Sequence, residues 1–376
     1  MVNVALGNAG VAACLLGDAD GSGTITINEI ISAVNNALSG CVLVPATPTV
    51  TPGGYPARGY QGPFVGLFLP IDVADEGTAD LVAQMTTTAK SFGLDSVNLV
   101  AEWRHLEPEE GAYNLARLER CVREVKQRGL ACIARVYTNM GPWRESYPAW
   151  LKNRLTDTYV SVPQGGGPGG FTQPMPFDPA YGEALRKFLD ALKDYFSRPE
   201  AAAPDLWQIA VGGEYGEMVL ASHPQVSSLE LGPVFSAEVD HVAWHTERAP
   251  AGASFILMGN SLWAANPNVE DTVPTAAYAA GVRLFQSNAG IRNLDGADYG
   301  SATLAMLARA QQRGFVLILE DESSAGPVTE RLDRIRAKEQ EYGIRVRFRG
   351  TTLRGGDLTE ANRVGIQELS THVKQP

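Results

Sequence analysis

The sequence predicts an α/β protein in which a (β/α)8 TIM barrel follows a small α-helical EF-hand module. A twelve-residue calcium-loop pattern lies near the N-terminus, and a stretch rich in proline, threonine and glycine follows it. From residue 63 onward, short apolar runs alternate eight times with longer segments of helical period. We therefore divide the chain into a calcium-binding module over residues 1–41, a linker over 42–62 and a barrel domain over 63–376.

The composition indicates a folded protein that does not bind nucleic acid. The 376 residues are 44% hydrophobic, which is enough for one large domain and a small one. A formal net charge of −11 repels phosphate backbones, and no run of lysine or arginine offsets it locally. The sequence has no run of ~20 apolar residues that would span a membrane, and its first residues lack the pattern of a signal peptide. Neutral or calcium-bridged ligands fit this composition.

The segment from Asp18 to Glu29 has the spacing of an EF-hand calcium loop. The predicted ligands stand at loop positions 1, 3, 5, 7 and 12: Asp18, Asp20, Ser22, Thr24 and Glu29. Gly23 permits the sharp turn, and an amphipathic helix follows at once. An Asp/Gly-rich surface turn is the alternative interpretation. Structural Ca²⁺ is therefore the predicted cofactor, and we expect no catalytic one.

Residues 2–7 are similar to residues 34–39, which suggests an internal repeat. We expect that the chain begins inside the exit helix of an earlier calcium loop, with further residues and a signal peptide upstream. Paired loops of this kind resemble dockerin modules and the EF-hand repeats of bacterial extracellular proteins. The resemblance implies an extracellular or cell-surface location and a cohesin-like or cell-surface partner.

The four cysteines fall into two pairs. Cys14 and Cys41 bracket the calcium loop, and both a disulfide and two free thiols remain open for them. Cys121 and Cys132 lie in apolar, periodic sequence, where buried free thiols are expected.

Eight predicted strands and the helices between them make up the barrel. The predicted strands are 64–69, 96–101, 131–137, 206–211, 254–258, 282–286, 315–319 and 344–348. The predicted helices include 78–92, 115–128, 181–196, 234–248, 301–313, 328–342 and 360–373. Gly93, Gly129, Gly314 and Gly343 are predicted helix C-caps. A doubly wound open sheet is the alternative, but the segment after the first strand has no glycine-rich nucleotide turn.

Two of the predicted strand ends carry clustered carboxyl groups. Glu214 and Glu217 follow the fourth strand, and Glu320, Asp321 and Glu322 follow the seventh. Barrel enzymes place reactive groups at the carboxyl ends of strands, and glycoside hydrolysis needs one protonated and one ionised carboxyl group. Since these strands face each other across a barrel mouth, they can supply such a pair.

Two segments of the predicted barrel carry family motifs. Residues 103–114 read WRHLEPEEGAYN, and residues 207–217 read WQIAVGGEYGE. The first is similar to the signature W-x-x-L-E-P-x-x-G-x-Y of barrel glycoside hydrolases in the clan that includes β-galactosidases and, more distantly, β-amylases. The second resembles the β-galactosidase strand W-Q-I-x-N-E-Y-G, with Gly213 in place of the asparagine. Read instead from Gly216 to Pro224, the sequence resembles the β-amylase strand G-E-L-R-Y-P-S-Y-P.

The resemblance implies a glycosidase that hydrolyses O-glycosidic bonds in an oligo- or polysaccharide. It implies Glu217 as the general acid, with Glu214 as the alternative in the other register, and Glu320 as the nucleophile or general base. Retaining and inverting mechanisms both remain open, because they differ in carboxyl separation, about 5 Å against about 6.5–9.5 Å. The alternative function is a catalytically silent barrel that binds glycans or cell-surface partners.

Aromatic and amide side chains near the strand ends are the predicted sugar-binding groups, because sugars stack on rings and bond their hydroxyls to polar atoms. These residues are Trp103, Tyr137, Asn139, Trp143, Asn260 and Gln286, with Trp263 and Asn288 as further candidates. Each tryptophan is equally interpretable as a core residue.

A glycine-rich stretch and a pair of histidines are the remaining features of the barrel sequence. The glycine-rich stretch 164–170 predicts a flexible loop near the cleft. His241 and His245 are four residues apart, but the H-E-x-x-H base is absent. We therefore interpret them as a solvated helix face and not as a metal site.

Overall fold

A computed structural model describes residues 64–138, 145–161, 171–209, 231–250, 252–259, 272–286, 300–320, 326–341 and 348–375. All of them belong to one compact unit, Ala57–Pro376. The calcium module with its ligands, the linker, and the Cys14 and Cys41 pair lie outside the described residues, so those expectations stay predictions.

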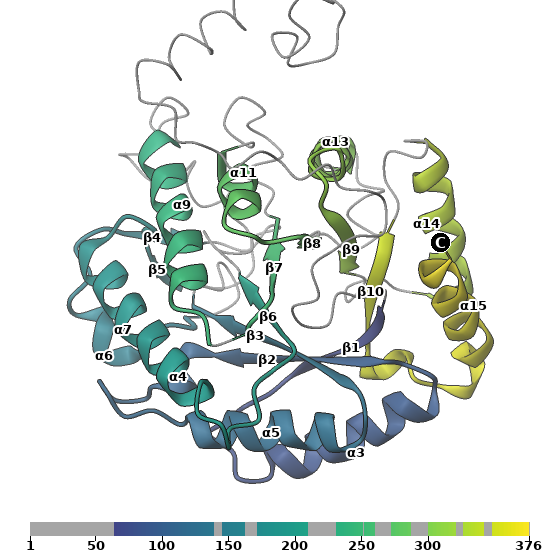
Figure 1. The fold of residues 1–376 in the computed structure, drawn as a ribbon, viewed down its shortest axis with the longest axis horizontal. Coiled ribbons are helices and arrows are strands. Elements are labelled where there is room, and N and C mark those ends of the chain that lie inside the picture. Colours follow the sequence, from purple (N-terminus) through teal and green to yellow (C-terminus); the bar gives the residue numbers. More distant parts are fainter. Residues whose placement is uncertain are drawn as a thin grey trace, which may run out of the picture. The chain divides into compact units, whose positions relative to one another are not determined.

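Eight parallel strands close into a barrel in the order β1-β10-β9-β8-β7-β6-β3-β2 (Figure 1). The strands are β1 (Phe64–Pro70), β2 (Ser96–Glu102), β3 (Ala131–Tyr137), β6 (Leu206–Ile209), β7 (Phe255–Met258), β8 (Leu284–Gln286), β9 (Val316–Glu320) and β10 (Phe348–Arg354). Because every neighbouring pair is parallel, all the carboxyl ends open on one side of the ring. The predicted barrel is confirmed over the described residues, and the open sheet is excluded.

Helices surround the barrel (Figure 1). They are α3 (Thr78–Ser91), α5 (Leu115–Gln127), α7 (Pro179–Phe196), α9 (Leu231–Glu247), α11 (Thr272–Ala279), α13 (Gly300–Gln312), α14 (Val328–Glu341) and α15 (Arg363–Lys374). Shorter elements are α4 (Trp103–Leu106), α6 (Ala149–Lys152), η4 (Gly355–Asp357), η5 (Glu360–Asn362) and the antiparallel pair β4 (Thr158–Ser161) and β5 (Phe171–Pro174). Within the described ranges, no helix has the length and apolar character needed to cross a bilayer.

The eighth barrel strand extends beyond the end of the predicted range. Of the predicted strand 344–348, Phe348 alone lies within the described residues, and β10 continues from it to Arg354. The sequence from Ile344 to Phe348 alternates apolar and charged residues, which favoured that prediction. In the structure β10 pairs with β1 from Phe64 opposite Gly350 to Phe68 opposite Arg354, and its central Thr351 and Thr352 are buried. Threonine and glycine make up the centre of this strand. Because neither residue is strongly apolar, hydropathy alone did not predict it.

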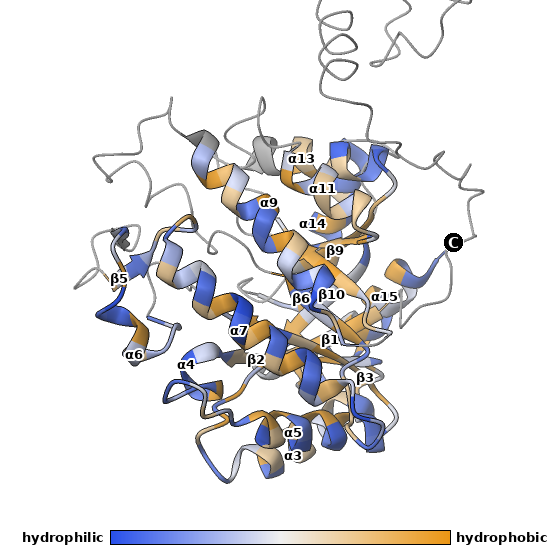
Figure 2. Cartoon of the chain, turned by 60° about the vertical axis from the view of Figure 1, so that its left-hand side comes forward, coloured by the Kyte–Doolittle hydropathy of each residue, from blue (hydrophilic) through white to orange (hydrophobic). Residues whose placement is uncertain are grey.

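The core has two layers. Inside the barrel, one residue from each of six strands forms an apolar floor: Phe64, Ile133, Leu206, Ile256, Leu284 and Ile318. A larger cluster fills the space between the strands and the helices, and the helices turn their polar residues away from it (Figure 2). The apolar floor closes the amino-terminal end of the barrel, so an internal site can open only toward the carboxyl ends of the strands.

Local predictions about helix ends and thiols are confirmed where the residues are described. Gly93, Gly129 and Gly314 have φ values of 81°, 75° and 100°, the left-handed conformation expected of a C-cap glycine. Cys121 and Cys132 are buried free thiols. Burial raises the pKa of Cys121 to about 11, so its thiol is protonated and unreactive at neutral pH.

Asp178 joins the segment before β4 to the start of α7. As the N-cap of α7, its carboxylate accepts hydrogen bonds from the backbone N–H of Tyr181 at 2.9 Å, of Thr156 at 2.7 Å and of Asp157 at 2.7 Å. Burial by itself would raise the pKa of Asp178, but these N–H donors outweigh it and lower the pKa. The ionised carboxylate therefore stabilises the contact between the segment before β4 and the start of α7.

We expect Asp178→Asn to lower the free energy of unfolding by about 1.5–3 kcal/mol at neutral pH, because an amide cannot accept all of these bonds. The folded pKa lies below the unfolded value of about 3.9, so the contribution is present above that pH and is lost as the pH falls through the folded pKa. Urea unfolding at pH 7 and pH 3 measures the difference from wild type. An equal difference at both pH values would contradict this account.

Candidate active site

Glu320 lies at the carboxyl end of the barrel, as predicted, because it is the last residue of β9. It pairs with Thr352 of β10 and stands two residues beyond Ile318, which belongs to the apolar floor. The backbone of Glu320 thus lies at the end of β9, two residues along the strand from the apolar floor.

A polar layer lies above the apolar floor, inside the barrel. Arg135 of β3 donates from Nε to Oε1 of Gln208 in β6, at 2.6 Å. Gln208 donates from Nε2 to Oε1 of Gln286 in β8 at 2.8 Å, and it accepts a bond of 3.3 Å from the amide of Asn98 in β2. These four residues come from alternate or neighbouring strands of one ring, so the layer spans most of the barrel interior.

Aromatic rings line the next level toward the mouth. Phe68 of β1, Val100 of β2 and Tyr137 of β3 form a separate small cluster. The guanidinium of Arg135 lies 5.5 Å from the ring centre of Phe68 and 5.4 Å from that of Tyr137, and Nη1 of Arg135 bonds the Tyr137 hydroxyl at 2.7 Å. Arg354, at the exposed end of β10, lies 6.0 Å from the Phe68 ring centre. This side of the interior therefore combines aromatic surface with positive charge.

Two of the predicted sugar-binding residues, Tyr137 and Gln286, belong to these layers. They are 3% and 1% exposed, and each bonds a residue of the polar layer. Nε2 of Gln286 is buried and has no hydrogen-bond partner among the described residues, which leaves its two amide hydrogens for waters or sugar hydroxyls. Sugar contact by either residue stays a prediction.

Trp103 is a core residue, and its predicted stacking on a sugar is wrong for this structure. Its side chain is fully buried, with its ring 5.2 Å from that of Phe188. The indole N–H donates to Oε2 of Glu107 at 2.8 Å, and Oε1 of Glu107 accepts from the backbone N–H of Gly111 at 2.9 Å. Gly111 has a φ of 76°, which favours glycine. The motif WRHLEPEEGAYN thus encodes a hydrogen-bonded turn.

Acidic side chains near the ends of the first two strands each contact a basic side chain. Arg104 Nε lies 2.6 Å from Oε2 of Glu102, and His105 Nδ1 lies 3.0 Å from Oδ1 of Asp72. Glu102 is 6% exposed and ends β2, so it is a further strand-end carboxyl group that the sequence interpretation missed. Asn98, Arg135 and Gln208 were missed too. Their common signal is a polar residue inside an otherwise apolar strand.

His241 does not lie on a solvated helix face, contrary to the prediction. It is 3% exposed and packs on Tyr181 and Trp244, at ring distances of 5.7 Å and 4.8 Å. Burial lowers the pKa of His241 to about 3, so the ring is neutral. Among the described residues, no group of three His, Cys, Asp or Glu side chains could hold a metal ion. The ring of His241 therefore packs within the fold.

The other predicted site residues lie outside the described ranges. They are Glu214, Glu217, Asn139, Trp143 and Asn260, with Asp321, Glu322, Trp263, Asn288 and the stretch 164–170. Of the predicted carboxyl pair, the structure thus places the backbone of Glu320 alone.

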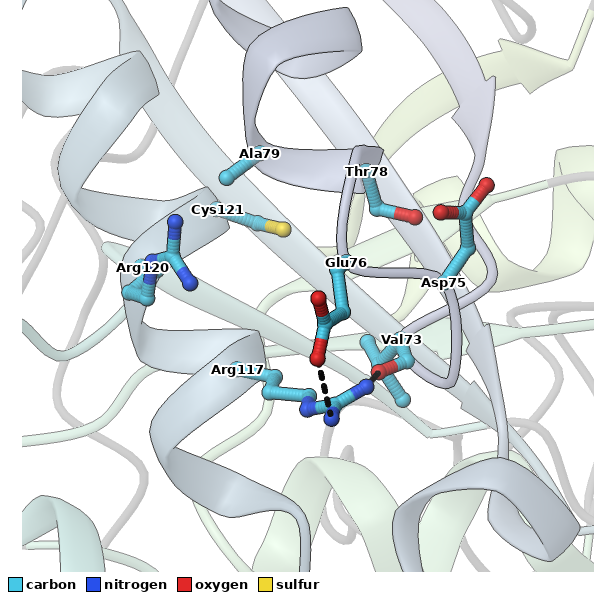
Figure 3. Close-up of a pocket in the computed structure, with 8 residues that line it drawn as sticks. All are labelled: Val73, Asp75, Glu76, Thr78, Ala79, Arg117, Arg120 and Cys121. Carbon is cyan, nitrogen blue, oxygen red and sulfur yellow. Dashed lines mark hydrogen bonds and ion pairs between the residues drawn. The ribbon is translucent and has the colours of Figure 1, made fainter.

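A pocket of about 320 Å³ lies on the outer ring, between the start of α3 and α5 (Figure 3). Its lining residues are Val73, Asp75, Glu76, Thr78, Ala79, Arg117, Arg120 and Cys121. Arg117 is held by the carbonyl oxygens of Val73 and Ala74 at 3.2 Å and 2.6 Å. No strand residue lines this pocket, so it is separate from the barrel interior.

Comparison with protein families matches residues 74–226 to the glycoside hydrolase family 42 model, described as β-galactosidase. The matched segment contains both motifs found in the sequence, WRHLEPEEGAYN and WQIAVGGEYGE. A search of curated protein sequences finds no match.

Solved structures share the barrel at low sequence identity. The catalytic domain of a β-amylase from Paenibacillus polymyxa aligns with a TM-score of 0.56 and 11% identity over 83% of this chain and 99% of that one. A β-galactosidase from the psychrophilic Marinomonas ef1 gives 0.55 and 12%, over 83% and 59%. An exo-β-1,4-mannosidase from Opitutaceae bacterium strain TAV5 gives 0.55 and 15%, over 87% and 63%. The predicted resemblance to barrel glycoside hydrolases is confirmed.

We expect Glu107→Ala to lower the free energy of unfolding by about 2–4 kcal/mol, because it leaves the buried indole N–H of Trp103 and the backbone N–H of Gly111 without their acceptor. The neighbouring, exposed Glu109→Ala is the matched control and should change it by less than about 0.5 kcal/mol. Denaturant unfolding of both variants measures this. Equal stabilities for the two variants would show that the turn does not depend on Glu107.

Proposed function

We propose that this chain, whose barrel is that of a glycosidase, hydrolyses O-glycosidic bonds in an oligo- or polysaccharide with carboxyl groups from the ends of β6 and β9. Glu217, which follows β6, is the general acid, with Glu214 as the alternative. Glu320, at the end of β9, is the nucleophile or general base. Glycoside hydrolysis requires such a pair on either side of the scissile bond.

The position of Glu320 carries the proposal. In the ring order, β6 and β9 are separated by β7 and β8 on one side and by β10, β1, β2 and β3 on the other. Groups that follow these two strands therefore approach the mouth from well-separated directions, as a pair flanking one bond must. The family match, which extends to residue 226, includes the segment that bears Glu214 and Glu217.

The described interior supports a sugar ligand. Phe68 and Tyr137 provide aromatic surface, and the amide NH2 of Gln286 provides donors for hydroxyl groups. The apolar floor below the polar layer prevents a ligand from passing through the barrel. A substrate must therefore lie across the carboxyl-end mouth, where the carboxyl groups are proposed to act.

We also propose that the N-terminal module binds Ca²⁺ structurally through Asp18, Asp20, Ser22, Thr24 and Glu29, and that the protein acts outside the cell. The support is the loop spacing and the Pro/Thr linker. A cohesin-like or cell-surface partner for this module is part of the same proposal.

We expect wild-type protein to release reducing sugar from at least one member of a panel of plant, bacterial and storage polysaccharides. Glu217→Gln and Glu320→Gln should each reduce kcat/KM by about 10²–10⁴-fold, because each removes an acid/base or nucleophilic group. Exposed Glu330→Gln on α14 is the control and should be unchanged. If Glu214→Gln is inactive while Glu217→Gln is active, the acid is Glu214.

Glycan binding without turnover by any preparation would instead favour a catalytically silent barrel. In that case, Glu217→Gln and Glu320→Gln should leave glycan affinity unchanged.

Calcium titration by calorimetry tests the module. We expect one site in the wild type and its loss in Glu29→Gln, because the twelfth loop position supplies two carboxylate oxygens. Hydrolysis by the barrel should be the same in both proteins. Equal calcium affinity in the two proteins would rule out the EF-hand assignment.

A further inference from the structure

We propose that the pocket between the starts of α3 and α5 binds a small hydroxylated organic acid, which is the chemistry of a sugar acid. Its volume of about 320 Å³ lies at the lower end of the range of about 300–1,000 Å³ that small-molecule sites occupy. All of its lining residues belong to the described part of the chain. The inference does not rest on the proposed hydrolysis, because it involves neither of the proposed catalytic carboxyl groups.

The pocket has a buried base and a charged rim. Val73, Ala79 and Cys121 are 1%, 8% and 1% exposed, and they form an apolar base. Around this base, the segment after β1 contributes the carboxyl groups of Asp75 and Glu76, and α5 contributes two arginines (Figure 3). An apolar base with a few converging polar groups is the usual arrangement of a small-molecule site.

Arg117 is held in place while half of its guanidinium fork stays available. Its Nη1 donates to the carbonyl oxygens of Val73 and Ala74 at 3.2 Å and 2.6 Å, which fixes the group against the segment after β1. Its Nη2 lies 3.8 Å from Oε1 of Glu76, which is too far for a hydrogen bond. The Nη2 hydrogens can therefore donate to an incoming carboxylate, the acceptor that a guanidinium binds most strongly.

Arg120 supplies a second guanidinium, three residues further along α5 and so on the same side of the helix. Its side chain is exposed and makes no hydrogen bond or ion pair within the described ranges. By contrast, Arg123 of the same helix, which does not line the pocket, is paired with Glu119. The two arginines that line the pocket are thus the ones on α5 without a carboxylate at hydrogen-bond distance.

Glu76 occupies the position that the carboxylate of a ligand would take. Figure 3 shows its carboxylate within the pocket and directed at Arg117. The side chain of Glu76 is 91% exposed, so it can turn out into solvent at little cost in free energy. A ligand carboxylate would then replace it and could bond both arginines.

With Glu76 turned outward, the charges around the pocket favour an anion. Arg117 and Arg120 then stand against the carboxylate of Asp75, and the amino end of α3 adds partial positive charge. Asp80, in the first turn of α3, opposes an anion. Because its side chain is exposed, solvent screens that repulsion.

Polar groups beside the arginines suit hydroxyl groups on the same ligand. Oδ1 of Asp75 accepts from the backbone N–H of Gly77 at 2.8 Å, which leaves Oδ2 as an acceptor. The backbone N–H of Ala79, in the first turn of α3, bonds no acceptor among the described residues. The hydroxyl of Thr78 donates to the carbonyl oxygen of Asp72 and can accept in turn. A carboxylate next to hydroxyl groups is therefore the ligand chemistry that uses both sides of the pocket.

Arginine side-chain ¹H–¹⁵N NMR with glucuronate as the probe tests the inference. The Nε–H signals of Arg117 and Arg120 are assigned by their absence in the corresponding glutamine variants, and we expect both to shift and saturate as glucuronate is added. Followed at the Arg117 signal, Arg120→Gln should weaken binding about tenfold, because a charge-assisted hydrogen bond is lost. Glu76→Gln should strengthen binding about two- to fivefold, because it removes the competing carboxylate.

Arg123→Gln is the matched control, since Arg123 lies on the same helix, is paired with Glu119 and does not line the pocket. We expect this variant to bind glucuronate as the wild type does. If Arg120→Gln and Arg123→Gln weaken binding equally, the effect is one of overall charge and the inference is overturned.

Glucose and acetate separate the two halves of the proposed ligand. Glucose has the hydroxyl groups without the carboxylate, and acetate has the carboxylate without the hydroxyl groups. We expect each to bind at least about fivefold more weakly than glucuronate at the same signals. If glucose binds as tightly, the arginines do not recognise an acid, and if acetate does, the pocket takes any small anion. Either result, or the absence of a saturable shift with glucuronate, overturns the inference.

This test and the test of the proposed hydrolysis fail separately. The two arginine signals report the pocket alone, so they decide the inference whether or not any polysaccharide is hydrolysed. Loss of hydrolysis in Glu217→Gln or Glu320→Gln should leave the glucuronate titration unchanged.

Discussion

The parallel pairing of β1 with β10 closes the barrel, and the position of every internal side chain depends on it. This pairing brings Gly350 close to Phe64 of β1, and the pairing of β1 with β2 brings Gly66 close to Ser96. A Cβ atom added at Gly66 would lie 2.6 Å from the Ser96 hydroxyl, and one at Gly350 would lie 3.2 Å from the carbonyl oxygen of Phe64. Side chains at these positions would push the strands apart, so glycine at the seam sets how narrow the ring is. A narrow ring forces the internal residues into layers.

The interior of the barrel has an apolar layer and a polar layer. Apolar residues close the amino-terminal end of the barrel, and the polar layer of Asn98, Arg135, Gln208 and Gln286 lies above it. Burying an arginine costs free energy that an apolar residue of similar volume would not. The amide of Gln208 and the rings of Phe68 and Tyr137 hold Arg135 in one orientation.

The two family motifs have different physical roles. WRHLEPEEGAYN forms a turn in which Glu107 receives the Trp103 and Gly111 donors in a buried environment. Burial raises the pKa of Glu107 even though those donors lower it. This carboxyl group is used inside the fold and does not face a substrate. The similarity to barrel glycoside hydrolases in this motif therefore rests on a structural feature, whereas the carboxyl groups proposed for chemistry follow other strands.

The sequence by itself determined the order of strands and helices. Apolar runs of strand length alternate with amphipathic helices that end at glycine, and both signals depend only on neighbouring residues. It did not determine the extension of β10 to Arg354, the β4 and β5 pair or α11, because threonine-rich strands and short elements have little hydrophobic period. Only the tertiary structure placed Trp103 and His241 in the core and gathered Asn98, Arg135, Gln208 and Gln286 into one layer. Those residues are 188 positions apart at most along the chain, and a contact over that distance exists only once the barrel has closed.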